Sequence, residues 1–366
     1  MFKAAVMWAA NEPLKIESVD LKPPREDEVV VRIAASGICH SDLSIVKGNI
    51  PMMLPIVPGH EGAGIVEEVG KTVTNVKPGD HVVLSWVPDC GECHFCIAGK
   101  PHLCERFLLV MTEGREAVFL KDGVEIRRFS SVGSFAERTV VRADACIKIQ
   151  DDAPLDRACL VGCGVMTGVG AAINTAKVRP GETVAVFGCG GVGLNVVQGA
   201  AMCSAGKIIA VDLVEQKLQW AKEFGATDVV NGKDVDAVDA VRSLTNGLGV
   251  DYAFEAIGAA APITQAFMSI KRGGVMVLVG IPPFGNEISI PAAVLPMDEK
   301  SLVGSLYGSA NMRRDVPNLI ALYMQKRLKL DELISRRIKL EEVNTAFEAM
   351  EKGEVARSVI VFGSSR

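Results

Sequence analysis

The sequence predicts an α/β protein with two domains, one rich in short β-strands and one built on a doubly wound parallel sheet. Three observations support this fold class. The chain has 366 residues, and at roughly 150 residues per domain this length suggests about two domains. Up to about residue 150, short β-rich runs are separated by turns that contain glycine or proline. From Thr183 onwards, apolar strands alternate with helix-length segments, which is typical of a parallel sheet covered by helices on both faces.

The predicted elements follow this division. The β-rich part contains four clear strands, at Glu28 to Ala34, Gly64 to Val69, His81 to Trp86 and Phe135 to Val141. The alternating part contains strands at Thr183 to Gly188, Lys207 to Asp212, Asp228 to Val230, Tyr252 to Glu255 and Val275 to Val279. Helices are predicted between them, at Gly191 to Ala205, Glu215 to Phe224, Val235 to Thr245 and Ile263 to Ile270. The chain ends with mixed elements, at Val316 to Gln325, Leu340 to Lys352 and Ser358 to Phe362.

The composition is that of an ordinary globular protein, with 49% hydrophobic, 5% aromatic and 23% charged residues and a net charge of -5. It excludes a disordered chain, a collagen and a coiled coil. The chain is mildly acidic and has no run of basic residues to attract phosphates. Nucleic acid or an anionic membrane surface is therefore not expected as the main partner. The expected partners are small molecules.

Two uncharged stretches, Ala158 to Ala176 and Val184 to Gly206, have the length of membrane spans. The second contains six glycines together with Asn195 and Gln198, which favours a strand and helix buried in an α/β core. The seven apolar residues after Lys3 are too few for a secretory signal. We therefore expect a cytoplasmic protein without a membrane span.

Four of the ten cysteines lie within fifteen residues in the pattern C-x-x-C-x-x-C-x7-C, at Cys90, Cys93, Cys96 and Cys104. A cage of four thiolates with no open position is what a structural zinc ion requires. Redox-active thiols are the alternative. A nucleic-acid-binding zinc ribbon uses similar ligands, but the acidic flanks of this run, with Asp89, Glu92 and Glu105, argue against contact with phosphates.

A G-x-G-x-x-G motif, formed by Gly188, Gly190, Gly191, Val192 and Gly193 with Cys189, follows a predicted strand directly and opens a helix. In this context the glycines let the backbone approach a pyrophosphate, and the helix N-terminus attracts its charge. The next strand ends in Asp212, which is placed to accept the adenosine ribose hydroxyls and to repel a 2′-phosphate. The motif therefore predicts a dinucleotide site that favours NAD over NADP. Lys217 either adds a ribose contact or is a solvated helix lysine.

Three further segments each place one soft metal ligand beside glycines or polar residues: Cys39 before His40, Ser41 and Asp42; His60 between Gly59 and Glu61; and Cys163 between Gly162 and Gly164. Taken singly, the two cysteines are more often buried apolar thiols, and the histidine a core histidine with satisfied hydrogen bonds.

Taken together, in this order and with the four-cysteine run and the glycine motif, these residues resemble the zinc-dependent medium-chain alcohol dehydrogenase family over essentially the whole chain. The resemblance implies a GroES-like β-rich catalytic domain at residues 1–164 and 306–366, with a structural-zinc lobe at about residues 88–105. It implies a Rossmann NAD-binding domain at residues 165–305.

The resemblance also assigns roles, position by position. Cys39, His60 and Cys163 match the ligands of a catalytic zinc, which keeps a fourth position for water or the substrate oxygen. With the cage at Cys90, Cys93, Cys96 and Cys104, two zinc ions per chain are expected. Asp42 and Glu61 match carboxylates beside the metal, and Ser41 matches the hydroxyl that takes up the proton of the alcohol. The cofactor positions matched outside the glycine motif are His40, Val279, Ile281 and Arg357.

Two positions in the sequence bear on the reaction. In the family, the zinc polarises the substrate oxygen and hydride passes to the nicotinamide. Several members end the proton relay in a histidine three residues after the serine, but this chain has Ser44 there, so the relay ends in water or another group. Polyol dehydrogenases of the family typically have glutamate where this chain has Cys163, which favours an alcohol over a sugar alcohol.

The positions that line the substrate pocket in the family are all apolar here: Ile50, Trp86, Leu109 and Ile281. They predict a hydrophobic primary alcohol, aromatic or of medium chain length, or its aldehyde, unless these side chains pack a core beneath a more polar pocket. A formaldehyde dehydrogenase that acts on a thiol adduct stays open, although Ile50 and Leu108 replace the residues that bind glutathione. A non-redox lyase on the same fold is a further alternative. The long connection from Glu105 to Ser131 resembles that of dimeric members and predicts a homodimer, with a tetramer as the alternative.

Overall fold

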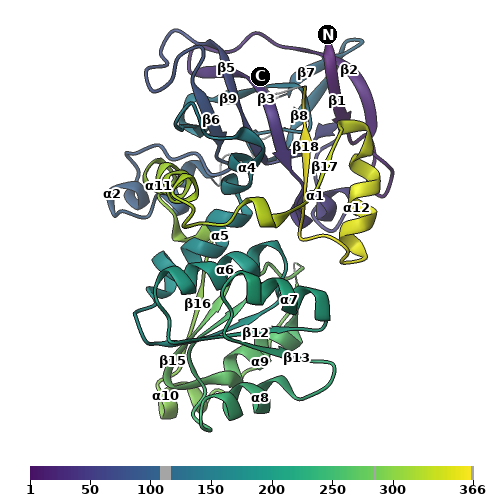
Figure 1. The fold of residues 1–366 in the computed structure, drawn as a ribbon. Helices are drawn as coiled ribbons and strands as arrows, with labels where there is room; N and C mark the ends of the chain where they lie inside the picture. The colour runs from purple at the N-terminus through teal and green to yellow at the C-terminus, as the bar shows by residue number, and fades with distance from the viewer. Residues whose placement is uncertain (108–116, 284, 364–366) are drawn as a thin grey trace. The chain divides into compact units, whose positions relative to one another are not determined.

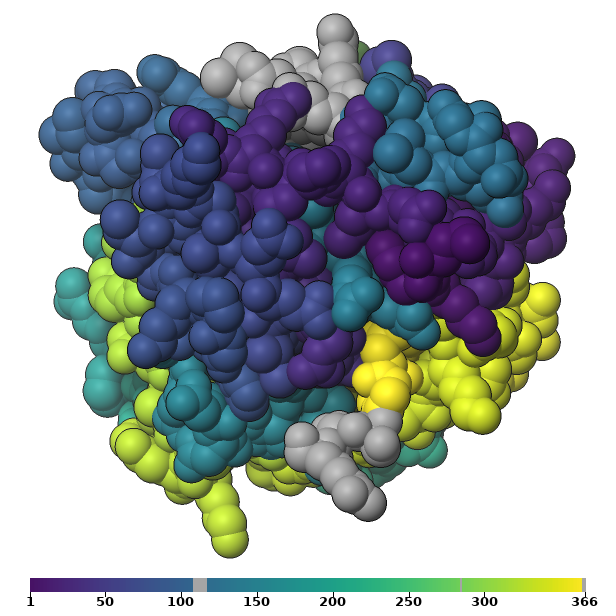
Figure 2. All heavy atoms as spheres, turned by 90° about the horizontal axis from the view of Figure 1, so that it is seen from above, coloured from purple at the N-terminus to yellow at the C-terminus, as the bar shows by residue number. Residues whose placement is uncertain are grey.

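The computed structural model describes residues 1–107, 117–283 and 285–363, and the chain forms two compact units. Unit 1 comprises Met1–Cys163 and Asn311–Arg366, and unit 2 comprises Gly164–Ala310. Unit 1 is therefore built from both ends of the chain, which the purple and yellow segments of Figure 2 show side by side. Leu108 and Leu109, two of the positions discussed above, lie outside the described residues.

Unit 1 contains two sheets among the described residues. The first has the strand order β1-β2-β7-β8-β4, and the second has the order β10-β6-β5-β3-β18-β17 with β9 paired to β3. The strands are β1 (Phe2–Val6), β2 (Lys15–Leu21), β3 (Glu28–Gly37), β4 (Ile56–Val57), β5 (Glu61–Val69), β6 (His81–Leu84), β7 (Ala117–Lys121), β8 (Val124–Arg128), β9 (Arg138–Arg142), β10 (Cys146–Lys148), β17 (Ile334–Ile338) and β18 (Arg357–Val361). The antiparallel pairing of β18 with β3 joins the two chain ends.

Short helices surround these sheets (Figure 1). They are α1 (His40–Val46), α2 (His94–Ile97), α4 (Leu155–Ala158), α11 (Met312–Met324) and α12 (Val343–Glu351), with the 3-10 turns η1 (Pro101–Leu103), η2 (Phe129–Ser131), η3 (Ala143–Ala145), η4 (Cys159–Gly162), η7 (Asp331–Leu333) and η8 (Leu340–Glu342). One core cluster joins Phe119 and Phe135 from the first half of the chain to Phe347 of α12. Because this core includes residues from both ends, unit 1 needs the C-terminal segment to bury its apolar surface.

Unit 2 contains one sheet, in which six described strands run parallel in the order β13-β12-β11-β14-β15-β16. The strands are β11 (Thr183–Phe187), β12 (Lys207–Asp212), β13 (Asp228–Asn231), β14 (Val250–Glu255), β15 (Ile270–Leu278) and β16 (Ser301–Gly304). The helices and turns are α5 (Gly164–Gly170), η5 (Ala171–Ala176), α6 (Gly191–Met202), α7 (Glu215–Glu223), α8 (Ala237–Leu244), α9 (Ala260–Ser269), α10 (Val294–Asp298) and η6 (Tyr307–Ser309). The predicted parallel sheet is confirmed.

The strand order of unit 2 reverses between β11 and β14, the two central strands. Helices α6 and α7 cover one face of the sheet, and α8 and α9 cover the other (Figure 1). Central strands must therefore be apolar on both faces, and Val184, Ala185 and Val186 are fully buried. In such sheets the point of reversal leaves a crevice at the carboxyl ends of the strands, where ligands bind.

Some predicted boundaries are wrong. The strand expected at Phe135 to Val141 begins at Arg138, because Phe135 turns into the core of unit 1. The helix expected to end at Ala205 ends at Met202. Strand β2 was not predicted, since its Lys15, Glu17 and Asp20 weaken the local signal; its pairing with β1 stabilises it.

No single helix in the described part of the chain is long and apolar enough to cross a membrane. One bent pair, Leu155–Gly162 with Gly164–Ala176, satisfies the criteria of length and composition only when taken together.

The core of unit 2 gives a test of the fold. Phe267 of α9 is fully buried, so Phe267→Ala should lower the free energy of unfolding by about 3–5 kcal/mol through lost apolar burial and a residual cavity. Urea denaturation followed by circular dichroism measures this loss. Leu248 is 72% exposed, and Leu248→Ala is the control, with an expected change within about 0.5 kcal/mol. Equal losses in the two variants would contradict the assigned burial.

Candidate active site and metal centres

The first turn of α1 fixes one part of the site. Cys39 is the residue that precedes this helix, and the side chain of Asp42 returns to accept a hydrogen bond from the Cys39 backbone N–H at 3.0 Å. The same carboxylate accepts the Gly59 N–H at 3.1 Å. A helix start with this reciprocal contact is rigid. Cys39 and the segment before β5 are therefore held by one buried carboxylate.

His60 lies in that segment, immediately before β5. Its Nδ1 is 2.9 Å from Oδ1 of Asp42. Because an ionised carboxylate can only accept, Nδ1 carries the proton and Nε2 is left with its lone pair, which is the arrangement that metal-binding histidines adopt. His60 is 3% exposed. The imidazole is thus fixed in orientation and tautomer by Asp42.

Cys163 follows the turn η4 and completes the group. Ligand atoms of Cys39, His60, Glu61 and Cys163 all lie within 4.8 Å of one another, and all four residues are buried. Two thiols and an imidazole around one point are a suitable donor set for zinc, with a position left for another ligand. The fold therefore brings together the three residues that the sequence proposes as ligands of a catalytic zinc, with Glu61 beside them.

The electrostatics of this group favour a thiolate at Cys39. A hydrogen bond from Cys163, together with His60 and Arg357, lowers the pKa of the Cys39 thiol well below its usual value against the effect of burial. The Cys39 contact and burial raise the pKa of Cys163. Burial alone would lower the pKa of His60, but the charges and hydrogen bonds of Asp42 and Cys39 together raise this pKa well above its usual value.

Glu61 and Arg357 form a fully buried ion pair beside these ligands. Nη2 of Arg357, the first residue of β18, donates to Oε2 of Glu61. Burial raises the pKa of Glu61, although the Arg357 charge opposes it. The sequence proposes Arg357 as a cofactor contact, and the structure places its guanidinium against a carboxylate of the metal site.

Ser41, the hydroxyl proposed for proton transfer, lies on α1. Oγ of Ser41 is 3.8 Å from Sγ of Cys39, and the residue is partly exposed. Ser44 lies one turn further along the same helix. His40, proposed as a pyrophosphate contact, is exposed at the first position of α1. The start of this helix therefore carries a proposed metal ligand, an exposed imidazole and a hydroxyl in succession.

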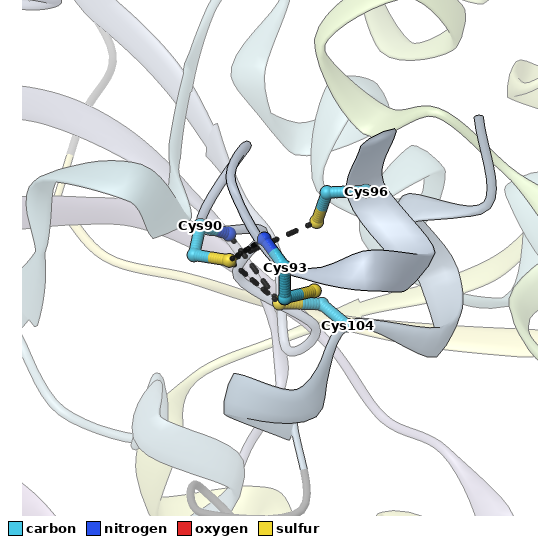
Figure 3. A group of neighbouring side chains, drawn as sticks. All are labelled: Cys90, Cys93, Cys96 and Cys104. Atoms are coloured by element: carbon cyan, nitrogen blue, oxygen red, sulfur yellow. Dashed lines mark hydrogen bonds between the residues drawn. The ribbon is translucent and has the colours of Figure 1, made fainter. Parts of the chain in front are cut away.

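The four-cysteine run forms a second group, drawn in Figure 3. The Sγ atom of Cys104 lies 3.5 Å from that of Cys90 and 3.8 Å from that of Cys93, and the Cys90–Cys96 separation is 3.9 Å. Zinc–sulfur bonds of about 2.3 Å in a tetrahedron require sulfur separations of about 3.8 Å. All ten cysteines are free. The cage therefore fits a closed zinc site and contains no disulfide.

Backbone groups support the thiolates of this cage. The Cys93 N–H donates to Sγ of Cys90, and the Cys90 N–H donates to Sγ of Cys104. Hydrogen bonds from the backbone of Cys96 and Glu105 lower the pKa of Cys93 to about 6, whereas burial raises that of Cys96 to about 12. A cage with mixed thiol acidities takes up zinc with release of protons.

Two arginines that the sequence did not single out anchor this lobe within unit 1. Arg106 pairs with Asp144 at 2.6 Å, and Arg313 of α11 pairs with Asp89 at 3.2 Å. Arg106 follows the last cysteine by two residues, but its partner is distant in the sequence. The local pattern therefore carried no signal for these pairs.

In unit 2 the glycine loop has the shape that the motif predicts. A Cβ at Gly193 would collide with the carbonyl oxygen of Gly188, whereas the space beside Gly190 is open. Gly188 has a positive φ of 93°. The loop can therefore bend directly from β11 into α6 and leave room for a phosphate at the helix start. These residues fit the pyrophosphate of a dinucleotide.

Asp212, at the end of β12, also holds this loop. Its Oδ2 accepts the Cys189 N–H at 2.7 Å, and its Oδ1 accepts the N–H groups of Leu213 and Val214. Leu213 is exposed and offers no cation for a 2′-phosphate. Lys217 lies in the next helix, α7. Val279 and Ile281 follow β15, the former buried and the latter 70% exposed.

Two aromatic rings lie beside His60 in unit 1. The Phe129 ring lies 5.6 Å from the imidazole and the Trp86 ring 6.4 Å from it, both edge to face, and Phe107 lies 5.6 Å from Trp86. Ile50 is partly buried against the main core of the unit. Phe107 and Phe129 were missed by the sequence analysis because no spacing links them to the ligands. Leu109 lies outside the described residues.

Comparisons with known proteins agree with this fold. Residues 25–151 match the alcohol dehydrogenase GroES-like domain, and residues 191–325 match the zinc-binding dehydrogenase model. Together the fold and the sites define a zinc-dependent dehydrogenase with a GroES-like and a Rossmann part. The chain belongs to the zinc-dependent medium-chain alcohol dehydrogenase family and is an oxidoreductase. The predicted family and fold class are confirmed.

Individual relatives match over nearly the whole length. Alcohol dehydrogenase class-3 of Drosophila melanogaster is 43% identical over 98% of this chain and 97% of its own. The crystal structure of an alcohol dehydrogenase zinc-binding domain protein from Burkholderia ambifaria matches this fold with a TM-score of 0.95 at 37% identity, covering 99% of each chain. The benzyl alcohol dehydrogenase of Acinetobacter calcoaceticus has a TM-score of 0.92 at 34% identity, also over 99% of each chain.

The two cysteine groups predict the metal content. Metal-replete protein should contain two zinc ions per chain by elemental analysis. Cys163→Ala should lose one zinc and nearly all turnover. Cys96→Ala should lose the other zinc and act through stability, since closed zinc sites support folding. Cys203→Ala, which lies outside both groups, is the control and should keep both ions. A fully active wild-type enzyme with one zinc would contradict the assignment.

Proposed function

We propose that the protein interconverts a hydrophobic primary alcohol, aromatic or of medium chain length, and its aldehyde, with NAD as the hydride carrier and two zinc ions per chain. The observation that carries the proposal is the aromatic group formed by Trp86 and Phe129, which lie beside His60, and Phe107, which lies beside Trp86. The solved relative named benzyl alcohol dehydrogenase supports an aromatic substrate.

Residues of unit 1 would hold and orient the reacting groups. When bound, the zinc supplies a Lewis acid and the nicotinamide accepts hydride. Cys39, His60 and Cys163 provide the ligands, and Asp42 keeps Nε2 of His60 directed to the metal. Oγ of Ser41 lies 3.8 Å from Sγ of Cys39, and by family position Ser41 would take up the proton of the alcohol. Ser44 has no imidazole, so water or another group would carry the proton away.

The carboxylate of Asp212 supports NAD over NADP. It stands at the end of β12 near the glycine loop, and no basic residue occupies the next position. A 2′-phosphate there would face a negative charge, and Leu213 offers no cation to compensate it. His40, Lys217, Val279, Ile281 and Arg357 are proposed as further cofactor contacts by family position.

Two other activities are compatible with the fold. The first is oxidation of a thiol adduct of formaldehyde. Ile50 offers no charge to bind a carrier such as glutathione, and Leu108, the other position that would contact the carrier, lies outside the described residues. A non-redox lyase is the other activity. Reduction of added NAD by an alcohol, followed by absorbance, separates it from a dehydrogenase. We also propose that the protein is cytoplasmic. The length of the segment from Glu105 to Ser131 supports a homodimer.

The cofactor proposal predicts the behaviour of Asp212 variants. Asp212→Gly should weaken NAD binding and raise relative use of NADP, because the repelling charge is removed. Asp212→Asn keeps hydrogen-bonding groups for the loop, so its shift in the ratio of kcat/KM for NAD to that for NADP isolates the charge. Glu215→Gln, at the start of α7, is the control. A wild type that prefers NADP, or an unchanged ratio in both variants, would refute the proposal.

The substrate proposal predicts a ranking of alcohols. About 100 Å² of additional buried apolar area favours benzyl alcohol or hexanol over ethanol by about 2.5 kcal/mol, which is roughly 70-fold in kcat/KM. Glycerol should be poorer still. Trp86→Ala and Phe129→Ala should reduce the ratio of benzyl alcohol to ethanol, since each ring is worth about 1 kcal/mol to an aromatic substrate. Trp220→Ala, in unit 2, should leave it unchanged.

Ethanol or glycerol matching benzyl alcohol would reject the apolar pocket. A ratio that is unchanged in Trp86→Ala would remove the role of that residue.

A further inference from the structure

Glu255, the last residue of β14, connects two loops at the carboxyl edge of the unit 2 sheet. Its side-chain Oε1 accepts the N–H groups of Ile257 at 3.0 Å and Gly258 at 2.8 Å. Its backbone carbonyl accepts the N–H groups of Val279 and Gly280, both at 2.9 Å. One residue therefore fixes the loop that follows its own strand and the loop that follows the neighbouring strand, β15.

The glycines around Glu255 lie in places that leave no room for a side chain. A Cβ at Gly280 would lie 2.8 Å from Oε2 of Glu255, and one at Gly258 would lie 2.6 Å from the carbonyl oxygen of Ile281. A Cβ at Gly188, in the glycine loop, would collide with the side chain of Ile257. The loops after β14 and β15 are thus in direct backbone contact, and the side chain of Ile257 packs against the glycine loop after β11. All three loops lie at the edge where ligands bind in such sheets.

The carboxyl group itself is costly to place here. Glu255 is 0% exposed, and its Oε2 has no hydrogen-bond partner among the described residues. Burial raises the pKa of Glu255, opposed by the backbone donors of Gly258 and Ile257. A buried polar atom without a partner destabilises a fold. Selection for stability alone would favour an apolar residue, so the position is explained by what its contacts hold in place.

The side chains held in this way are apolar and exposed. Ile257 is 54% exposed and Ile281 is 70% exposed, one on each loop that Glu255 fixes. Large apolar side chains that stand free on rigid loops next to a phosphate-binding turn are suited to contact the flat rings of a dinucleotide.

We propose that Glu255 is a positioning residue for the dinucleotide, because it sets the two loops that present Ile257 and Ile281 beside the glycine loop. The inference rests on dinucleotide binding to unit 2, as proposed above, but not on NAD being preferred over NADP.

NADH titrations followed by fluorescence test the proposal without turnover. Glu255→Ala should raise the NADH Kd about tenfold, the size expected when a loop contact worth about 1.4 kcal/mol is lost. Glu255→Gln keeps an acceptor for the two N–H groups and should bind within about twofold of wild type. The zinc content should not change in either variant.

Asp251 provides the matched control at the opposite end of the same strand. Its Oδ2 accepts the N–H and hydroxyl of Thr183, so it too links neighbouring strands. Asp251→Ala should lower the melting temperature and leave the NADH Kd unchanged. If Glu255→Ala lowers the melting temperature and leaves the Kd unchanged as well, Glu255 is merely structural and the proposal is wrong.

A double-mutant cycle covers the case in which Glu255→Ala folds poorly. Ile257→Ala with Ile281→Ala should weaken NADH binding. Glu255→Asp, whose shorter side chain draws the acceptor away from the two N–H groups, should then weaken binding less than it does in wild type if the residues act together. Additive effects would overturn the proposal. A wild type that binds neither NADH nor NADPH would instead reject the proposed dinucleotide function, which keeps the two failures distinct.

Discussion

The candidate active site depends first on the Asp42 carboxylate. It accepts the backbone N–H groups of Cys39 and Gly59 and the Nδ1 proton of His60, so it links the start of α1 to the segment before β5. Cys39 and His60 lie on separate segments. Without Asp42, these two proposed ligands would lose the side chain that holds them together. A buried carboxylate with three donors is well satisfied, which allows the group to be both fully buried and rigid.

The buried charges beside this centre compensate one another. Glu61 lies among the ligand atoms, and Arg357 neutralises it from β18, a strand contributed by the other end of the chain. The same arginine helps to lower the pKa of Cys39. Removing one partner of such a pair leaves an uncompensated buried charge, which is strongly destabilising. The C-terminal segment therefore contributes to the electrostatics of the site as well as to the core of unit 1.

In unit 2, the proposed dinucleotide site depends on backbone contacts at the carboxyl edge of the sheet. Asp212 and Glu255 end two strands on either side of β11, and each uses its carboxylate to hold a loop through backbone N–H groups. The glycines allow these loops to meet without side chains between them. The two carboxylates act in the same way, although the sequence motif points to Asp212 only.

The sequence by itself determined the features whose chemistry is local. The four cysteines of the lobe span fifteen residues, and the strand, glycine turn and helix that begin at Thr183 are contiguous, so spacing alone describes them. Cys39, His60 and Cys163 could be grouped only through resemblance to a family, and Phe107, Phe129, Arg313 and Glu255 not at all. Tertiary structure decided these, because residues distant in the sequence become neighbours only when sheets bury their apolar faces and the chain ends pair.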